Sequence, residues 1–126
     1  LTKKRSGSPG MTALCYCSNC QKSSGAGHVL HLGYKRDALK VEGDTGAHHY
    51  TAESGAKVTK SFCTSCGTNL FGETSSMPGF VMIAAATLDE PSSFAPQVAV
   101  FAKRRQSWDH DYPDIPAFEA MPPASE

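Results

Sequence analysis

The sequence has no surplus of either charge and no long apolar run. Lysine plus arginine and aspartate plus glutamate each number 12 in the 126 residues, so the formal net charge is zero. Proteins that bind nucleic acid or anionic membranes normally carry a basic excess, so this balance argues against both kinds of partner. The longest apolar stretch, residues 80–86, is far shorter than the roughly 20 residues that a helix needs to span lipid.

The sequence also lacks the patterns of a secretion signal and of a disulfide framework. The basic residues Lys3, Lys4 and Arg5 are followed by Ser, Gly and Pro, not by an apolar segment. The cysteine count of 5 is odd, and no cysteine lies outside two tight clusters. Closely spaced cysteines without a secretion signal are typical of reduced, metal-binding thiols. We therefore expect a cytoplasmic protein.

A chain of this length predicts a single domain. Residues 1–10 are basic and then rich in Ser, Gly and Pro, which indicates a disordered leader or a cloning remnant, with Met11 as the natural start. Residues 121–126 are expected to form a loose tail, so the domain itself would span residues 11–120. Its core would be modest for its surface, and a bound metal would add to its stability.

Short apolar and alternating segments predict strands, and no long amphipathic helix pattern is present. The strongest strand candidates are residues 80–85 and 97–103. Weaker strand candidates cover residues 27–33, 48–52, 56–62 and 68–73, and short turns or single helical turns are expected at 34–39 and 88–94. The sum predicts a mainly β domain of many short, mostly antiparallel strands.

The second cysteine cluster is a C-x-x-C-G knuckle formed by Cys63, Cys66 and Gly67. In such a knuckle the chain turns sharply and both sulfurs face one point, and a glycine after the second cysteine permits the positive φ that the turn requires. Zinc is the usual occupant of sites with this spacing. Cys63 and Cys66 are therefore interpreted as half of a structural four-cysteine site.

The first cluster, Cys15, Cys17 and Cys20, places three thiols within six residues. Three protein ligands leave the fourth position of a tetrahedral zinc open to water or substrate, as in a catalytic site. A zinc ion with three thiolates has a net negative charge, so it activates water poorly. It is better suited to holding an incoming thiol as a nucleophilic thiolate. The cluster therefore indicates a thiol substrate.

A closed site is the alternative. Cys17 and Cys20 could join Cys63 and Cys66 on one zinc, leaving Cys15 spare, in a non-catalytic zinc-ribbon-like module that binds a protein partner. The 42 residues between Cys20 and Cys63 exceed the usual separation of roughly 15–20 residues, although insertions are tolerated. The spacing alone leaves both arrangements open.

Four motifs resemble, in order, those of the glutathione-dependent formaldehyde-activating (GFA) family. Residues 15–25 resemble its C-H-C-x-x-C-R-K-x-x-G motif, and residues 62–71 resemble its F-C-x-x-C-G-T-x-L segment. Residues 86–91 are similar to its G-T-L-D-x-P stretch, and residues 107–108 to its late P-W position. The resemblance runs from about residue 14 to residue 118.

The resemblance implies a β-tent fold of several short antiparallel sheets with two zinc sites. It implies that Cys15, Cys17 and Cys20 hold a catalytic zinc, and that Cys63 and Cys66 supply half of a structural one. The implied activity is that of a carbon–sulfur lyase acting on a thiol adduct of formaldehyde such as S-hydroxymethylglutathione.

The sequence departs from the family pattern at three places. No cysteine precedes Cys15, so the early C-x-C-G that completes the family's structural site is missing. One or two zinc ions per chain would then bind, the second completed by histidine or by another chain in a homodimer. Tyr16 stands where the family often has His, and Gln21 where it often has Arg; both flank the expected substrate side.

Three residues outside the cysteine clusters yield further expectations. In an extended strand, His28 and His31 would point to opposite faces because they are three residues apart. Trp108 is expected to anchor the C-terminal segment by packing.

Overall fold

The structure is a computed structural model that describes residues 2–5 and 9–120, with only the backbone described for residues 2–5. The strands in these residues are β1 (Thr2–Arg5), β2 (Met11–Cys15), β3 (Val29–Lys35), β4 (Leu39–Glu42), β5 (Thr45–Thr51), β6 (Lys57–Cys63), β7 (Asn69–Thr74), β8 (Phe80–Ala84) and β9 (Val98–Val100). The helical elements are α1 (Ser18–Ser24) and the 3-10 turns η1 (Arg36–Ala38), η2 (Ala85–Thr87), η3 (Pro91–Ser93) and η4 (Ala102–Arg104).

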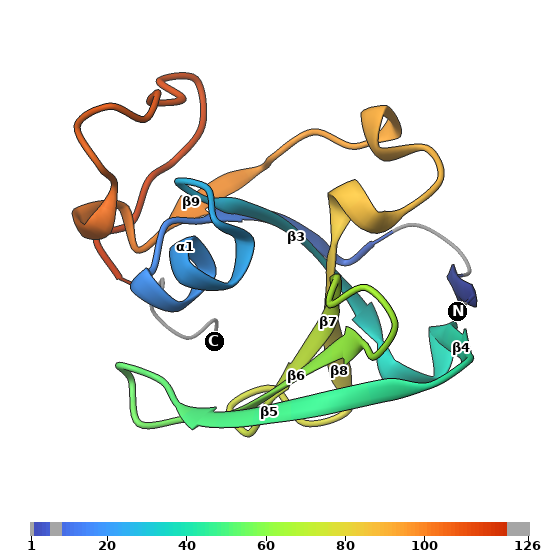
Figure 1. The fold of residues 1–126 in the computed structure, drawn as a ribbon. Helices are drawn as coiled ribbons and strands as arrows, with labels where there is room; N and C mark the ends of the chain where they lie inside the picture. Colours follow the sequence, from blue (N-terminus) through green and yellow to red (C-terminus); the bar gives the residue numbers. More distant parts are fainter. Residues whose placement is uncertain (1, 6–8, 121–126) are drawn as a thin grey trace.

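Seven strands form one sheet in the order β5-β6-β7-β8-β3-β2-β9, and β1 pairs with β4 in a separate two-stranded sheet. Neighbouring strands are antiparallel except for β2 and β9, which run parallel. The large sheet is strongly bent, so that β5 and β6 lie across from β3 and β9 instead of continuing in their plane (Figure 1). The expected mainly β fold with mostly antiparallel strands is confirmed.

The centre of the core lies where β3 pairs with β8. Leu32 is opposite Ile83 and Tyr34 is opposite Val81, so the four side chains share one face of the sheet. Leu32, Val81 and Ile83 are completely buried, and full burial of such a side chain contributes roughly 1.5–3 kcal/mol. The intervening residues of β3, including His31, face the other side of the sheet because strand side chains alternate.

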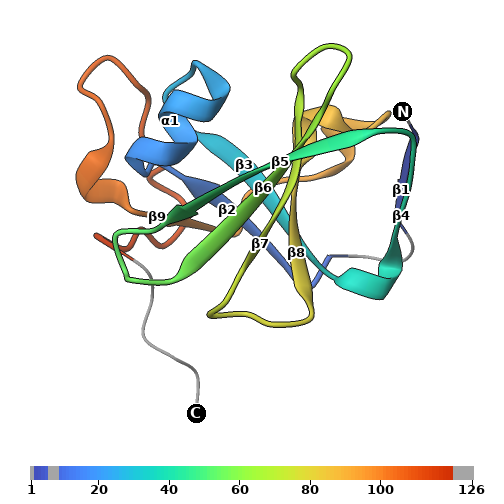
Figure 2. The ribbon, with the colours of Figure 1, turned by 60° about the horizontal axis from the view of Figure 1, so that its bottom comes forward.

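The N-terminal segment differs from its predicted state. Residues Thr2–Arg5 form β1, whose antiparallel register with β4 runs from Thr2 opposite Glu42 to Arg5 opposite Leu39, at one side of the molecule (Figure 2). Residues 1, 6–8 and 121–126 lie outside the described residues, so a leader or tail there stays a prediction.

The strand predicted at residues 97–103 ends early. Only Val98–Val100 are extended, because Phe101 adopts the left-handed conformation with φ 56° and the chain turns into η4. The short helical pieces expected within residues 34–39 and 88–94 are present as η1 and η3. The helix α1, only seven residues long, carries no long amphipathic pattern and was not predicted.

Candidate metal centre

The structure brings Cys15, Cys17 and Cys20 together. Cys15 ends β2, Cys17 precedes α1, and Cys20 lies in the first turn of that helix. The three Sγ atoms all lie within 4.8 Å of one another, a separation that one metal ion can bridge. The spacing of the motif thus has a simple geometric basis, since only two residues, Tyr16 and the extended Cys17, join the end of β2 to the start of α1.

Cys17 also caps α1. Its Sγ accepts a hydrogen bond from the backbone N–H of Cys20 at 3.3 Å, and its φ and ψ of −62° and 158° are those of an N-cap residue. At the other end, Gly25 has a φ of 70° and donates its N–H to the Gln21 carbonyl. Gly25, the glycine of the motif, therefore ends the helix in the left-handed conformation, which glycine adopts more readily than other residues.

The three thiols titrate as a group. Hydrogen bonds from Cys15 and Cys20 lower the pKa of the Cys17 thiol, while hydrogen bonds with Cys17 and Cys20, together with burial, raise the pKa of Cys15. A metal ion binds deprotonated sulfurs, so metal binding would release the protons that these thiols share. The donor set suits zinc, which favours thiolate ligands.

Apolar side chains form one wall of the cluster. Cys15 is 8% exposed and Cys20 is 4% exposed, and both pack with Val100, Val29 and Phe101. This wall removes water from one side of the sulfurs and strengthens electrostatic interactions there.

The cluster also opens into a cavity of about 380 Å³, which Val100 and Phe101 help to line. Its lining includes Cys15, Cys17, Cys20, His31, Tyr50, Lys60, Met82 and Phe101. The size lies within the range of small-ligand sites, so a ligand has room beside the three sulfurs. Burial, followed by the charges of the cysteines, raises the pKa of Tyr50 in this cavity, so its hydroxyl keeps its proton.

His31 lies beside the cluster on β3. Its Nε2 is 3.3 Å from Sγ of Cys20, and its buried Nδ1 has no hydrogen-bond partner among the described residues. Burial, with a smaller contribution from Lys60, lowers the pKa of His31 to about 4. The imidazole is therefore neutral near pH 7, where an Nε2–H can donate to the sulfur of Cys20.

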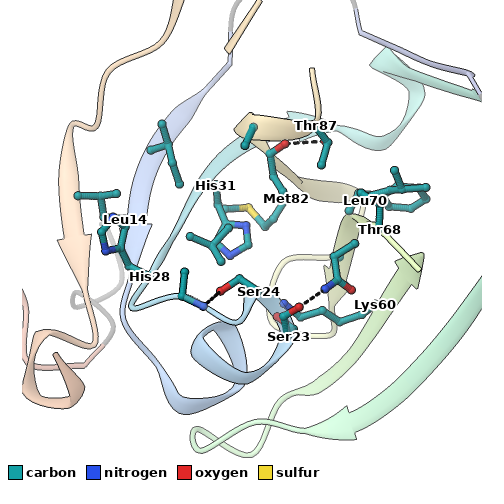
Figure 3. Close-up of a pocket in the computed structure, with 18 of the residues that line it drawn as sticks. Leu14, Ser23, Ser24, His28, His31, Lys60, Thr68, Leu70, Met82 and Thr87 are labelled. Atoms are coloured by element: carbon teal, nitrogen blue, oxygen red, sulfur yellow. Dashed lines mark hydrogen bonds between the residues drawn. The ribbon is translucent and has the colours of Figure 1, made fainter. Parts of the chain in front are cut away.

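A second cavity of about 760 Å³ adjoins the first (Figure 3). The two cavities share His31, Lys60, Gly72 and Met82 in their linings. Asn69 and Ser23 both line the larger cavity, and Asn69 joins β7 to α1 there by donating from Nδ2 to the Ser23 carbonyl at 2.6 Å. A ligand with its sulfur at the cysteine cluster could therefore extend past His31 and Lys60 into the larger space.

Cys63 and Cys66 lie outside this group. Gly67 has a φ of 77°, which confirms the predicted turn. Within residues 2–5 and 9–120, no third Cys, His, Asp or Glu joins this pair in a ligand group. The closed site of Cys17, Cys20, Cys63 and Cys66 is likewise not formed, since Cys15 completes the cluster instead. The half-site interpretation of Cys63 and Cys66 stays a prediction.

Tyr16 and Gln21, expected beside the substrate, serve the scaffold instead. Tyr16 is 1% exposed, and its hydroxyl donates to the His110 carbonyl. Gln21 donates from Nε2 to the carbonyls of Tyr16 and Arg104 at 2.7 and 2.9 Å, and accepts from Gln106 at 3.0 Å. Both residues fasten the C-terminal segment to the cysteine motif.

His28 lies just before β3, and both His28 and His31 line the larger cavity, so the expected opposite orientation of the two stays a prediction. His28 contacts the Tyr16 ring at 5.1 Å between centroids, and its Nδ1 is 2.7 Å from Oδ2 of Asp109. This contact joins residues 81 positions apart, and no sequence signal indicated it. Trp108 was predicted wrongly as a packing anchor, because it is 68% exposed. Its neighbour Asp109 makes the anchoring contact.

Fold and site together define a β-rich protein with a three-cysteine group that could hold a metal ion beside a cavity. The family model described as "Glutathione-dependent formaldehyde-activating enzyme" matches residues 2–104, and the chain belongs to this family. No characterised protein matches the chain in a sequence comparison. None of the helices in the described residues is long and apolar enough to cross a bilayer.

Proposed function

We propose that the protein is a zinc-dependent enzyme of the carbon–sulfur lyase class that forms or cleaves the adduct of a small thiol with formaldehyde, such as S-hydroxymethylglutathione. The observation that carries the proposal is the group of three cysteine thiols facing a cavity. Cys15, Cys17 and Cys20 would hold the zinc. The metal would supply an open position that keeps a thiol sulfur deprotonated and nucleophilic at neutral pH.

The residues around the cavity fit this chemistry. When a thiolate sulfur bonds to the formaldehyde carbon, the carbonyl oxygen gains negative charge and must receive a proton. Tyr50 lines the cavity and keeps its proton there, so its hydroxyl is suited to donate a hydrogen bond to that oxygen. The apolar wall of Val100 and Phe101 limits the access of water.

The larger cavity is suited to the remainder of the thiol. Glutathione carries two carboxylates, and the Lys60 ammonium lies where the two cavities meet. A cation at this junction favours an anionic substrate whose sulfur lies at the cysteines.

The test is the rate of adduct formation from glutathione and formaldehyde by zinc-loaded protein, measured by exchange NMR spectroscopy at equilibrium. We expect a rate above that of the spontaneous reaction, and we expect Cys15→Ser to return it to the spontaneous value. His49→Ala is the control, since His49 is exposed on β5 and contacts Thr59, away from the cysteines. Fully zinc-loaded wild-type protein that leaves the rate unchanged would refute the substrate assignment.

A further inference from the structure

Glu53 connects two walls of the smaller cavity, into which the cysteine cluster opens. It lies in the turn between β5 and β6, strands that lie across from β9 in the bent sheet (Figure 1). Its Oε1 is 2.8 Å from Nη2 of Arg104 and 3.2 Å from Nζ of Lys103, and both of these residues belong to η4, just after β9. Glu53 and Arg104 line the same cavity as the three cysteines. The ion pairs therefore lie at the border of the space that a thiol ligand would enter.

The two cations are carried by a segment that is tied to the cysteine motif. The Arg104 carbonyl accepts a hydrogen bond from Nε2 of Gln21 at 2.9 Å, and Gln21 directly follows Cys20. The Arg104 N–H donates to the Phe101 carbonyl, also at 2.9 Å. These bonds fix the backbone of η4 relative to the sulfurs, whereas the Arg104 side chain is half-exposed and can take a new partner.

Glu53 shows that this pair of cations accommodates a carboxylate. The guanidinium of Arg104 and the ammonium of Lys103 contact the same carboxylate oxygen, Oε1. All three side chains are 41–47% exposed, and ion pairs in contact with water are weak. Another carboxylate can therefore replace that of Glu53 at little cost, because the cations exchange one anionic partner for another.

We propose that Arg104 and Lys103 bind a carboxylate of the thiol substrate, and that Glu53 occupies this place until the substrate displaces it. The inference rests on the proposed function, because the substrate sulfur is taken to lie at the cysteines. Lys60 lines both cavities and supplies a further cation on β6 (Figure 3). A thiol with a carboxylate on each side of its sulfur, as in glutathione, can use both cationic positions. The cavity therefore selects dicarboxylate thiols over neutral ones.

The test is the binding of glutathione to zinc-loaded protein without formaldehyde, measured by isothermal titration calorimetry. Glutathione diethyl ester, in which both carboxylates are masked, is the comparison ligand. We expect Glu53→Gln to bind glutathione roughly 2- to 5-fold more tightly than the wild type, the range of an exposed ion pair, because the competing carboxylate is gone. Its affinity for the ester should equal that of the wild type. Lys103→Gln/Arg104→Gln should bind glutathione more weakly than the wild type.

A combined variant separates displacement from a general effect of charge. Adding Glu53→Gln to Lys103→Gln/Arg104→Gln should leave the affinity for glutathione unchanged, because the carboxylate site is already absent. A general effect of the negative charge would raise the affinity in this background as well. Glu42→Gln is the matched control, since Glu42 is an exposed carboxylate paired with Lys40 on β4, and it should bind glutathione like the wild type.

Equal affinities of the wild type and Glu53→Gln for glutathione would overturn the proposal, and so would the same gain in both backgrounds. The proposed reaction fails on a different result. Binding that follows the expected pattern without faster adduct formation would refute the reaction and support the carboxylate site. Faster adduct formation together with equal glutathione affinities of the wild type and Glu53→Gln would refute the site and support the reaction.

Discussion

His31 directs Nε2 at the sulfur of Cys20 from 3.3 Å, while its Nδ1 is buried without a hydrogen-bond partner in the described part of the chain. An imidazole N–H that donates to a ligand sulfur orients that ligand and adjusts its basicity. The lone Nδ1 costs about 1–3 kcal/mol if it stays unpaired.

Replacing His31 should therefore weaken metal binding and leave the fold intact. We expect His31→Phe to lower the zinc affinity about 10- to 100-fold, the usual effect of removing a group that orients a metal ligand. His31→Gln keeps an N–H donor and should lose much less. Competition with a chromophoric chelator measures both affinities. Equal affinities for the wild type and His31→Phe would show that the contact with Cys20 does not act on the metal.

A methyl group at Gly27 should disrupt the anchor between His28 and Asp109. A Cβ at this position would collide with the Asp109 carboxylate, so Gly27→Ala must push Asp109 away from His28. We expect a loss of about 1–3 kcal/mol in the free energy of unfolding, typical of overpacking. Urea denaturation of Gly27→Ala, Asp109→Ala and the double variant forms a thermodynamic cycle. The methyl should cost much less where Asp109 is already absent, and equal costs in both backgrounds would contradict the mechanism.

Phe101 is the one non-glycine residue with positive φ among the described residues, at 56°. This conformation costs an L-residue roughly 1–2 kcal/mol, which glycine avoids. Phe101→Gly and Phe101→Ala both remove the ring that packs on the cysteine cluster, so comparing them isolates the backbone contribution. We expect Phe101→Gly to be the more stable by about 1 kcal/mol in denaturant unfolding. Greater stability of the alanine variant would show that the backbone is unstrained.

Glu53 joins the β5–β6 turn to η4, with Oε1 at 2.8 Å from Arg104 and 3.2 Å from Lys103. Arg104 first and Lys103 second lower the pKa of the Glu53 carboxyl. A carboxyl group whose pKa is lower in the folded than in the unfolded protein stabilises the fold at pH values above its unfolded-state pKa. This stabilisation is lost as the pH falls through its folded-state pKa. We expect Glu53→Gln to melt below the wild type at pH 7, and we expect this difference to shrink as the pH falls below about 4.3, the usual pKa of a glutamate in an unfolded chain.

Salt is the control for this contact. All three side chains are exposed, so added salt at pH 7 should also shrink the difference in melting temperature. A difference that survives both low pH and high salt would mean that Glu53 acts through packing.

The strand that the sequence predicted best is β8, all of whose residues are apolar. Residues 80–85 gave a clear signal because Val81 and Ile83 are fully buried in the sheet. The end of β9 was missed because nothing in its apolar run marks the left-handed residue at Phe101. The helix α1 is set by the cap at Cys17 and the glycine at position 25, so periodicity could not find it.

The cysteine cluster was predictable because its geometry is local, with all three cysteines within six residues. The surroundings were not, since they come from distant segments. His31 reaches Cys20 because Ala13 lies opposite His31 and Cys15 lies opposite Val29 in the pairing of β2 with β3. This strand register could not be predicted from the sequence alone. The anchoring of the C-terminal segment was predicted for Trp108, because a large aromatic side chain usually anchors by packing, whereas Asp109 makes the contact.

The parallel pairing of β2 and β9 has a consequence for the order of assembly. Val98 and Val100 pair with Ala13 and Cys15 across about two thirds of the chain, and Val100 packs against the cysteines. During synthesis the three thiols emerge from the ribosome long before the strand that covers them. A metal ion could therefore enter while the site is still uncovered, and the last strand would then slow its escape. In the finished protein, metal exchange would follow the transient detachment of β9, a rate that amide hydrogen exchange at Tyr16, whose N–H donates to the Val100 carbonyl, reports.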